Sequence, residues 1–382
     1  MASNATEDLT QAVRTALSRV EDPEIRRPIT ELGMLDSLTV TEAGVAQVRV
    51  LLTVAGCPMR EKLTTDVTAA VSAVPGVSEV QLDLGVMTDE QRKQLHTQLR
   101  GDNPVNEIPF AQPGSRTRVY AVASGKGGVG KSSVTVNLAV ALAQRGLQVG
   151  VLDADIYGFS VPRMLGVIGK PTQVDKMIMP PQADGGVKVI SIGMFTPGNT
   201  AVVWRGPMLH RALQQFLADV FWGDLDVLLM DLPPGTGDIA ISLAQLVPSA
   251  ELLVVTTPQL AAREVAERAG SIALQTHQQI VGVVENMSWL EQPDGSRLEL
   301  FGAGGGQAVA DSLSESTGTR VGLLGQVPIE VAIREGGDVG TPIVVSDPSS
   351  PAARAFGTIA DTLAGRQRSL VGRSLGLSVA GR

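Results

Sequence analysis

The sequence has little of the chemistry on which several classes of protein depend. Among 382 residues there is one cysteine, Cys57, so a single chain can form no internal disulfide and no four-thiolate cluster site. Aromatic residues make up only 3% of the chain, which argues against base-stacking platforms for nucleic acids. The formal net charge is −8, so no basic excess attracts a polyanion, and we expect no nucleic-acid partner.

Long hydrophobic runs are also missing. No stretch approaches the roughly 18 consecutive apolar residues that a membrane-spanning helix requires. The first 20 residues include Glu7 and Asp8 in place of the apolar core of a signal peptide. We therefore expect no membrane span and a cytoplasmic location.

The first hundred residues have the pattern of a small domain. Residues 5–19 place apolar side chains at helical spacing, and residues 44–54 are rich in β-branched side chains. A second helical pattern begins at residue 59, and a second strand pattern lies within residues 75–84. These elements predict an α+β domain over residues 1–101.

The rest of the chain has a different pattern. Residues 102–117 are rich in proline and have little periodicity, which predicts a linker. From residue 118 to 366, seven apolar strands alternate with helical stretches, which favours a mostly parallel sheet covered on both faces. The predicted fold class is therefore an α/β domain with a mostly parallel sheet, preceded by a small α+β domain. Residues 367–382 are basic and contain glycine, and we expect a flexible tail there.

A phosphate-binding loop opens the second domain. In ASGKGGVGKSS (residues 123–133), Gly125, Gly130, Lys131 and Ser132 match the pattern G-x-x-x-x-G-K-[ST] between an apolar strand and a helix. Glycines let backbone N–H groups point at phosphate oxygens, and the helix N-terminus adds its positive dipole end. The lysine places a charge at the β and γ phosphates, and the serine hydroxyl binds Mg²⁺. The predicted nucleotide-binding residues here are Gly125, Lys126, Gly127, Gly128, Val129, Gly130, Lys131, Ser132 and Ser133.

Acidic side chains stand where two later strands end. Asp153 and Asp155 close the first of these strands in VLDADIYG, and Asp231 closes the second in DVLLMD. Strand carboxyl ends are where open α/β sheets bind their ligands. A carboxylate at the position of Asp231 can hold Mg²⁺ through water.

The loop GKGGVGKS resembles the deviant phosphate loop of the MinD/ParA/nitrogenase iron-protein class. This resemblance implies that Lys126 crosses a homodimer interface to the partner's ATP, so that Lys126, Lys131 and Asp155 are the expected catalytic residues. It further implies that Asp155 orients the attacking water and that Asp153 joins Ser132 and Asp231 around Mg²⁺. Asn286, at the end of a late strand, is expected to hydrogen-bond the adenine.

Within that class the chain is similar to the Mrp/ApbC branch of bacterial iron–sulfur cluster carriers. Three segments match this branch: the long stretch at 204–238 that contains LPPGTGD, VTTPQ (255–259) and FGAGGG (301–306). The N-terminal motifs DPE, LTVAGCP and PGVSEV are similar to those of SufT-type assembly domains. The resemblance implies a Mg²⁺-dependent ATPase that transfers iron–sulfur clusters to apoprotein clients.

The chain departs from that branch at one place. Typical members have C-x-x-C shortly after the segment ENMS, whereas this chain has Gln292 and Gly295 at about those positions. Neither side chain supplies a thiolate, so the usual cluster site is missing. Cys57 precedes a predicted helix, whose dipole lowers a thiol pKa, and we consider it a possible iron–sulfur ligand.

Two alternatives remain open at this point. One is a positioning ATPase similar to MinD or ParA, although the glycines of the basic tail weaken any amphipathic helix there. The other is an ATP-dependent assembly scaffold that holds no cluster of its own. A nitrogenase-type reductase needs two cysteines per subunit, and the single cysteine excludes that arrangement.

Overall fold

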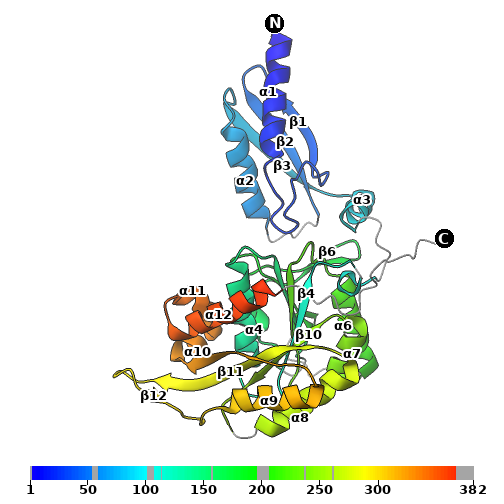
Figure 1. The fold of residues 1–382 in the computed structure, drawn as a ribbon. Coiled ribbons are helices and arrows are strands. Elements are labelled where there is room, and N and C mark those ends of the chain that lie inside the picture. Colours follow the sequence, from blue (N-terminus) through cyan, green and yellow to red (C-terminus); the bar gives the residue numbers. More distant parts are fainter. Residues whose placement is uncertain are drawn as a thin grey trace, which may run out of the picture. The chain divides into compact units, whose positions relative to one another are not determined.

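The computed structural model describes residues 2–53, 59–100, 107–112, 114–155, 158–195, 206–235, 238–259 and 262–366. Its contacts divide the chain into two compact units (Figure 1). The first unit comprises Met1–Glu107 together with two segments from later in the chain, Gly169–Pro181 and Asp219–Gly223. The second unit comprises the remainder. None of the helices within the described ranges is both long and apolar enough to cross a membrane.

The first unit is a small α+β fold. Strands β1 and β2 pair antiparallel, and β2 pairs with β3 in parallel, with helix α2 in the crossover between them. A separate two-stranded hairpin is formed by β6 and β7. The elements are α1 (Ala2–Leu17), β1 (Leu35–Val40), β2 (Val45–Leu52), α2 (Arg60–Ser72), β3 (Glu79–Val86), α3 (Asp89–Arg100), β6 (Thr172–Val174) and β7 (Met177–Met179).

Sequence periodicity explains how the first unit closes its core. Strand β2 alternates buried and exposed residues, as expected for a sheet with one wet face. Helix α2 buries Leu63, Val67 and Val71, which are four residues apart and therefore lie on one stripe. Val174 and Met177 of the β6–β7 hairpin belong to the same buried cluster, so the core of this unit is completed by a distant part of the sequence.

The second unit is a parallel sheet with helices on both faces (Figure 1). Its elements up to the middle of the sheet are η1 (Pro109–Ala111), β4 (Arg118–Ala123), α4 (Lys131–Ala143), β5 (Val149–Asp153), α5 (Val161–Met164), β8 (Lys188–Ser191), η2 (Ile192–Phe195), α6 (Gly206–Ala218) and β9 (Val227–Asp231). The remaining elements are α7 (Asp238–Leu246), β10 (Glu251–Thr256), α8 (Ala262–Thr276), β11 (Ile280–Glu291), β12 (Arg297–Leu298), α9 (Gly305–Thr317), β13 (Leu323–Ile329), α10 (Val331–Val339), α11 (Ile343–Ser346) and α12 (Pro351–Gly365).

The first strand of the second unit, β4, lies in the middle of the sheet. The sheet runs β12-β11-β10-β4-β9-β5-β8, and β13 pairs with β11. The β11–β12 pair is antiparallel, and the other pairs of this sheet are parallel. Because β4 lies between β9 and β10, the chain moves outward on both sides of β4. The carboxyl end of β4 is therefore a switch point, where open α/β sheets form a crevice.

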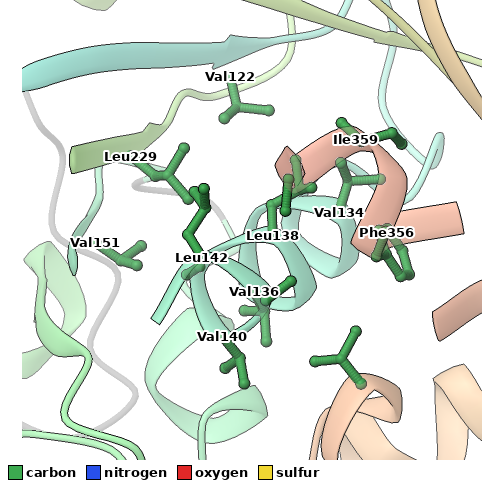
Figure 2. Close-up of a cluster of buried hydrophobic side chains, with 14 of the residues drawn as sticks. Val122, Val134, Val136, Leu138, Val140, Leu142, Val151, Leu229, Phe356 and Ile359 are labelled. Atoms are coloured by element: carbon green, nitrogen blue, oxygen red, sulfur yellow. The ribbon is translucent and has the colours of Figure 1, made fainter. Parts of the chain in front are cut away.

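Helix α4 is the centre of the hydrophobic core. Figure 2 shows its side chains between Val122, Val151 and Leu229 of the sheet on one side and Phe356 and Ile359 of α12 on the other. Every residue of α4 from position 134 to 142 is buried, because the helix is covered by both the sheet and α12. The helix that follows the phosphate loop is thus anchored along its length.

The predicted fold class is confirmed. All seven apolar strands expected after residue 118 are present as β4, β5, β8, β9, β10, β11 and β13. Strands β1, β6, β7 and β12 are additional to those predicted. Part of the segment predicted as a linker forms η1, whose Phe110 is buried at 2% exposure within the second unit. The tail predicted at 367–382 and Cys57 lie outside the described residues.

Candidate nucleotide-binding site

The glycine-rich loop connects the central strand β4 to the first turn of α4. Gly128 and Gly130 have φ angles of 76° and 75°, which only glycine adopts readily. Gly130 has a second constraint, because a Cβ there would lie 2.3 Å from the Asn286 side-chain nitrogen. The loop therefore holds its backbone at the N-terminus of α4, the arrangement that binds phosphate groups.

Asp231, at the end of β9, is the polar centre of the site. Its carboxylate is fully buried and lies 2.8 Å from the Lys131 ammonium. It also accepts hydrogen bonds from the hydroxyls of Ser132, at 2.6 Å, and Thr135, at 2.7 Å. Hydroxyl and carboxylate oxygens are the ligands that Mg²⁺ prefers, so this donor set fits the expected metal. Ser132 and Asp231 would hold the ion, and Mg²⁺ supplies positive charge against the phosphates.

Asp153 lies beside Asp231, because β5 and β9 pair in register at these two residues. Its carboxylate accepts a hydrogen bond from the Ser191 hydroxyl at 3.0 Å and from the backbone N–H of Asp155 at 3.2 Å. Burial, and then the charge of Asp231, raise the pKa of Asp153 to about 7. A divalent cation at this place would favour the ionised form, which fits a role for Asp153 near a metal.

Asp155 starts the loop after β5. It is nearly buried, at 9% exposure, and its carboxylate accepts the backbone N–H of Gly158 at 3.2 Å. This bond joins the residues on either side of positions 156 and 157, which are outside the described residues. The backbone of Asp155 lies next to the Asp153–Asp231 pair, and its role in a first switch stays a prediction.

Asn286 links the loop to a cavity. Its side-chain amide donates to the backbone oxygen of Val129 at 2.9 Å, and the residue is 5% exposed. Asn286 also lines a cavity of about 570 Å³, a volume in the range of small-molecule sites. The other residues of this cavity include Gly130, Ser133, Met164, Met287 and Phe301. A mainly apolar pocket at the phosphate loop is suited to a nucleotide base and its ribose.

Lys126 occupies a separate position on the loop. Its ammonium contacts the side-chain oxygen of Gln259, which follows β10. The loop at this point is held by two further bonds, from Arg268 to the Gly125 oxygen at 2.8 Å and from the Ser124 hydroxyl to the Lys126 oxygen at 3.0 Å. The two lysines of the loop thus have different partners, since Lys131 pairs with the buried Asp231.

The segment in which the resemblance led us to expect C-x-x-C is a β-hairpin in this chain. Gln292 and Gly295 form its turn, closed by a hydrogen bond of 2.9 Å between them. The guanidinium carbon of Arg297 on β12 lies 3.9 Å from the ring centroid of Trp289 on β11, and this cation–π contact joins the two strands. Within the described part of the chain, no group of three or more His, Cys, Asp or Glu side chains is arranged to hold a metal.

The structure brings most of the predicted site together. The loop residues from Gly125 to Ser133 adjoin Asp153, Asp155, Asp231 and Asn286 at one end of the sheet. Sequence reasoning missed three polar neighbours, Thr135, Ser191 and Gln259. Thr135 could have been predicted, because it stands one helical turn after Lys131 and therefore lies on the same face of the helix. Ser191 could not, because its place in the site depends on the pairing of β8 with β5.

Two protein families match separate parts of the chain. The family described as "NUBPL iron-transfer P-loop NTPase" matches residues 115–364, and "Iron-sulfur cluster assembly protein" matches residues 10–82. The chain is 64% identical over 370 residues to the "Iron-sulfur cluster carrier protein" of Mycobacterium tuberculosis, covering 97% of both chains. It is 41% identical over 364 residues to the protein of the same name from Synechocystis, covering 94% of this chain and 97% of that one.

One solved structure supports the fold. A nucleotide-binding protein from Archaeoglobus fulgidus in complex with ADP is 34% identical and superposes with a TM-score of 0.51. The match covers 66% of this chain and 91% of that one.

Proposed function

This chain belongs to the family of iron–sulfur cluster carrier P-loop NTPases, and on that basis we propose that it is an ATP-hydrolysing homodimer that carries iron–sulfur clusters to apoproteins. The observation that carries the proposal is an intact phosphate loop whose two lysines have different partners. Lys131 and Ser132 meet Asp231, while Lys126 stands apart at the edge of the loop. Such a division suits one lysine for its own nucleotide and the other for a partner's.

In this proposal each residue of the site has one task. The loop backbone and Lys131 bind the phosphates, and the cavity beside Asn286 receives the base. Ser132, Asp153 and Asp231 hold Mg²⁺, and Asp155 orients the attacking water. Lys126 of each protomer stabilises the negative charge that develops on the partner's γ-phosphate, as an arginine finger does. Hydrolysis therefore depends on the dimer.

The cluster is the cargo of this cycle. Because a hairpin turn occupies the place of C-x-x-C, we propose Cys57 as the thiolate that each protomer supplies. Two copies in a homodimer provide two thiolates, and a client's cysteines complete the set during transfer. Residues 1–101 would act as the assembly domain and residues 118–366 as the ATPase.

The hairpin favours a second candidate function as well. If Cys57 binds no cluster, the chain is an ATP-dependent scaffold that brings clients and other carriers together. Anaerobic reconstitution with iron and sulfide, comparing wild type with Cys57→Ser, separates the two. We expect wild type to bind iron and sulfide and to gain visible absorption, and we expect the variant to do neither. Equal loading of both proteins would remove Cys57 from the mechanism.

Transfer tests the carrier function itself. Reconstituted protein is mixed with an apoprotein that acquires activity with its cluster, with and without ATP and Mg²⁺. We expect the rate of activation to change with ATP in wild type and to be insensitive to ATP in Lys126→Ala. Wild-type protein that loads a cluster but never activates the apoprotein would contradict the carrier function.

A further inference from the structure

Lys126 is held by Gln259, a residue outside the phosphate loop. Gln259 lies three residues beyond the end of β10, in the segment VTTPQ, and its amide oxygen accepts from the Lys126 ammonium. Gln259 is exposed, and Lys126 is half-buried. Both residues belong to the same protomer, so this contact holds the lysine within its own chain.

The segment that carries Gln259 packs against the start of helix α9. Helix α9 begins so close to it that a Cβ on Gly305 would lie 2.5 Å from the Pro258 oxygen and 2.8 Å from the Thr257 oxygen. The next residue, Gly306, donates its N–H to the carboxylate of Glu285 at 2.5 Å, and Glu285 is 1% exposed. The FGAGGG motif thus lets α9 pack directly on the backbone that presents Gln259.

The other side of the contact is fixed as well. Arg268 of α8 donates to the oxygen of Gly125, the residue before Lys126, at 2.8 Å. Since the backbone is anchored on both sides, the long side chain of Lys126 is the part that can move. Breaking one exposed hydrogen bond frees it, and no element has to shift.

We propose that Gln259 is a positioning residue that holds Lys126 within its own protomer and releases it when two protomers close on ATP. This inference rests on the proposed function, because it assigns Lys126 a target on the partner. A neutral amide suits the task. It orients the ammonium, but an exposed hydrogen bond to it is weak enough to be exchanged for the charged phosphates of a nucleotide.

Two substitutions change the strength of this contact in opposite directions. Gln259→Ala removes the acceptor, and Gln259→Glu replaces it with a carboxylate that pairs with the lysine. Each exposed contact of this kind changes an equilibrium by about threefold, and a dimer must break two, so each variant shifts dimerisation by about tenfold. The alanine variant should favour the dimer, and the glutamate variant should oppose it.

The test measures ATP hydrolysis per protomer against protein concentration, with Mg²⁺ and ATP in excess. We expect the protein concentration at half-maximal rate to fall about tenfold in Gln259→Ala and to rise about tenfold in Gln259→Glu. The shift in the glutamate variant should shrink in high salt, since exposed charges are screened. Gln275→Glu is the matched control: it adds the same charge on α8, where Gln275 bonds Ser271.

A second measurement separates holding Lys126 from a merely structural role. Dimer formation with a non-hydrolysable ATP analogue is followed by sedimentation, and both substitutions are repeated together with Lys126→Ala. The opposite shifts should vanish when the lysine is absent. Shifts that persist would show that Gln259 acts without Lys126, which overturns the inference.

Other outcomes are equally decisive. If both Gln259 variants lose hydrolysis at every protein concentration, Gln259 acts on the nucleotide itself and does not restrain Lys126. If both behave as wild type while Lys126→Ala is inactive, only this inference fails and the proposed dimer stands. If Lys126→Ala hydrolyses ATP normally, at a rate per protomer that does not depend on concentration, the proposed function fails and takes the inference with it.

Discussion

At the scale of single residues, the site consists of buried charges that satisfy one another. Asp231 is fully buried, and one ammonium and two hydroxyls surround its carboxylate. A buried carboxylate is tolerated only where such partners offset the loss of water. Each partner of Asp231 therefore affects the stability of the domain and, under the proposed function, the binding of Mg²⁺.

Thr135 is the partner whose contribution can be isolated. Thr135→Val keeps the shape of the side chain but removes the hydroxyl that donates to Asp231 at 2.7 Å. We expect a loss of about 1–3 kcal/mol in the free energy of unfolding and a higher Mg²⁺ concentration at half-maximal ATP hydrolysis. Thr135→Ser, which keeps the hydroxyl, should keep the Mg²⁺ requirement of wild type, although the loss of a buried methyl lowers its stability. An unchanged Mg²⁺ requirement in the valine variant would contradict this role.

Glu24 makes the first unit sensitive to pH. Burial, and then the nearby charge of Asp22, raise the pKa of Glu24 to about 7 from its ordinary 4.5, despite a contact with the Thr172 hydroxyl at 3.4 Å. Between pH 4.5 and 7 the folded chain therefore keeps a proton that the unfolded chain has released. Stability should fall as pH rises through this window, by at most about 1.4 kcal/mol per pH unit for this group.

Calorimetric unfolding of the full chain at pH 5, 6, 7 and 8 measures this dependence. Glu24→Gln is expected to flatten the fall in unfolding temperature over that range. A residual slope is expected, because burial also raises the pKa of Asp22 and that of Asp153 in the second unit. A slope as steep in the variant as in wild type would mean that other groups take up the proton.

At the scale of elements, close packing of backbone decides where glycine is required. Helix α9 starts against the end of β10, and a side chain on Gly305 would overlap two backbone oxygens. Backbone atoms cannot turn aside as side chains can, so the helix itself would have to move. The start of α9 and the end of β10 therefore behave as one packed unit.

Gly305→Ala tests this contact. We expect a loss of about 1–3 kcal/mol in the free energy of unfolding, because the added methyl forces a backbone shift. Gly322→Ala is the matched control, since a Cβ there meets no atom within 4 Å. Urea unfolding midpoints of the two variants measure the difference. Equal midpoints would show that α9 can retreat at no cost.

The elements also show how far sequence patterns reach. Continuous apolar strands such as β9 were predictable, because a strand buried on both faces needs apolar side chains at every position. Strands β6, β7 and β12 have three residues or fewer, and tertiary pairing decides them, so periodicity carries no signal there. In the site, motif spacing pointed to Lys131 and Asp231. The contact between Gln259 and Lys126 can be seen only in the structure, because it depends on β10 lying beside β4.

At the scale of the whole molecule, the two lysines of the loop should separate binding from hydrolysis. Lys131→Ala is expected to lose nucleotide binding by at least tenfold and also to destabilise the domain, because Asp231 then keeps a buried charge without its ammonium. Lys126→Ala should bind a fluorescent ATP analogue within about threefold of wild type but hydrolyse ATP at least a hundredfold more slowly.

Titration of the analogue and a phosphate-release assay on the same preparations measure both quantities. Lys126→Arg serves as the control for charge, since it keeps a cation of similar reach at the loop. Loss of binding in Lys126→Ala equal to that in Lys131→Ala would mean that both lysines serve the same nucleotide.

The assembly of the first unit from three stretches of chain has a consequence for the gene. Val174, Met177 and Met179 are encoded inside the nucleotide-binding domain, yet they complete the core of the N-terminal domain. A shortened gene beginning after codon 107 would encode every strand of the large sheet and still leave these three side chains in water. Recombination that exchanges the N-terminal domain for another would have to supply a new cover for this hairpin, so the two domains are expected to be inherited together.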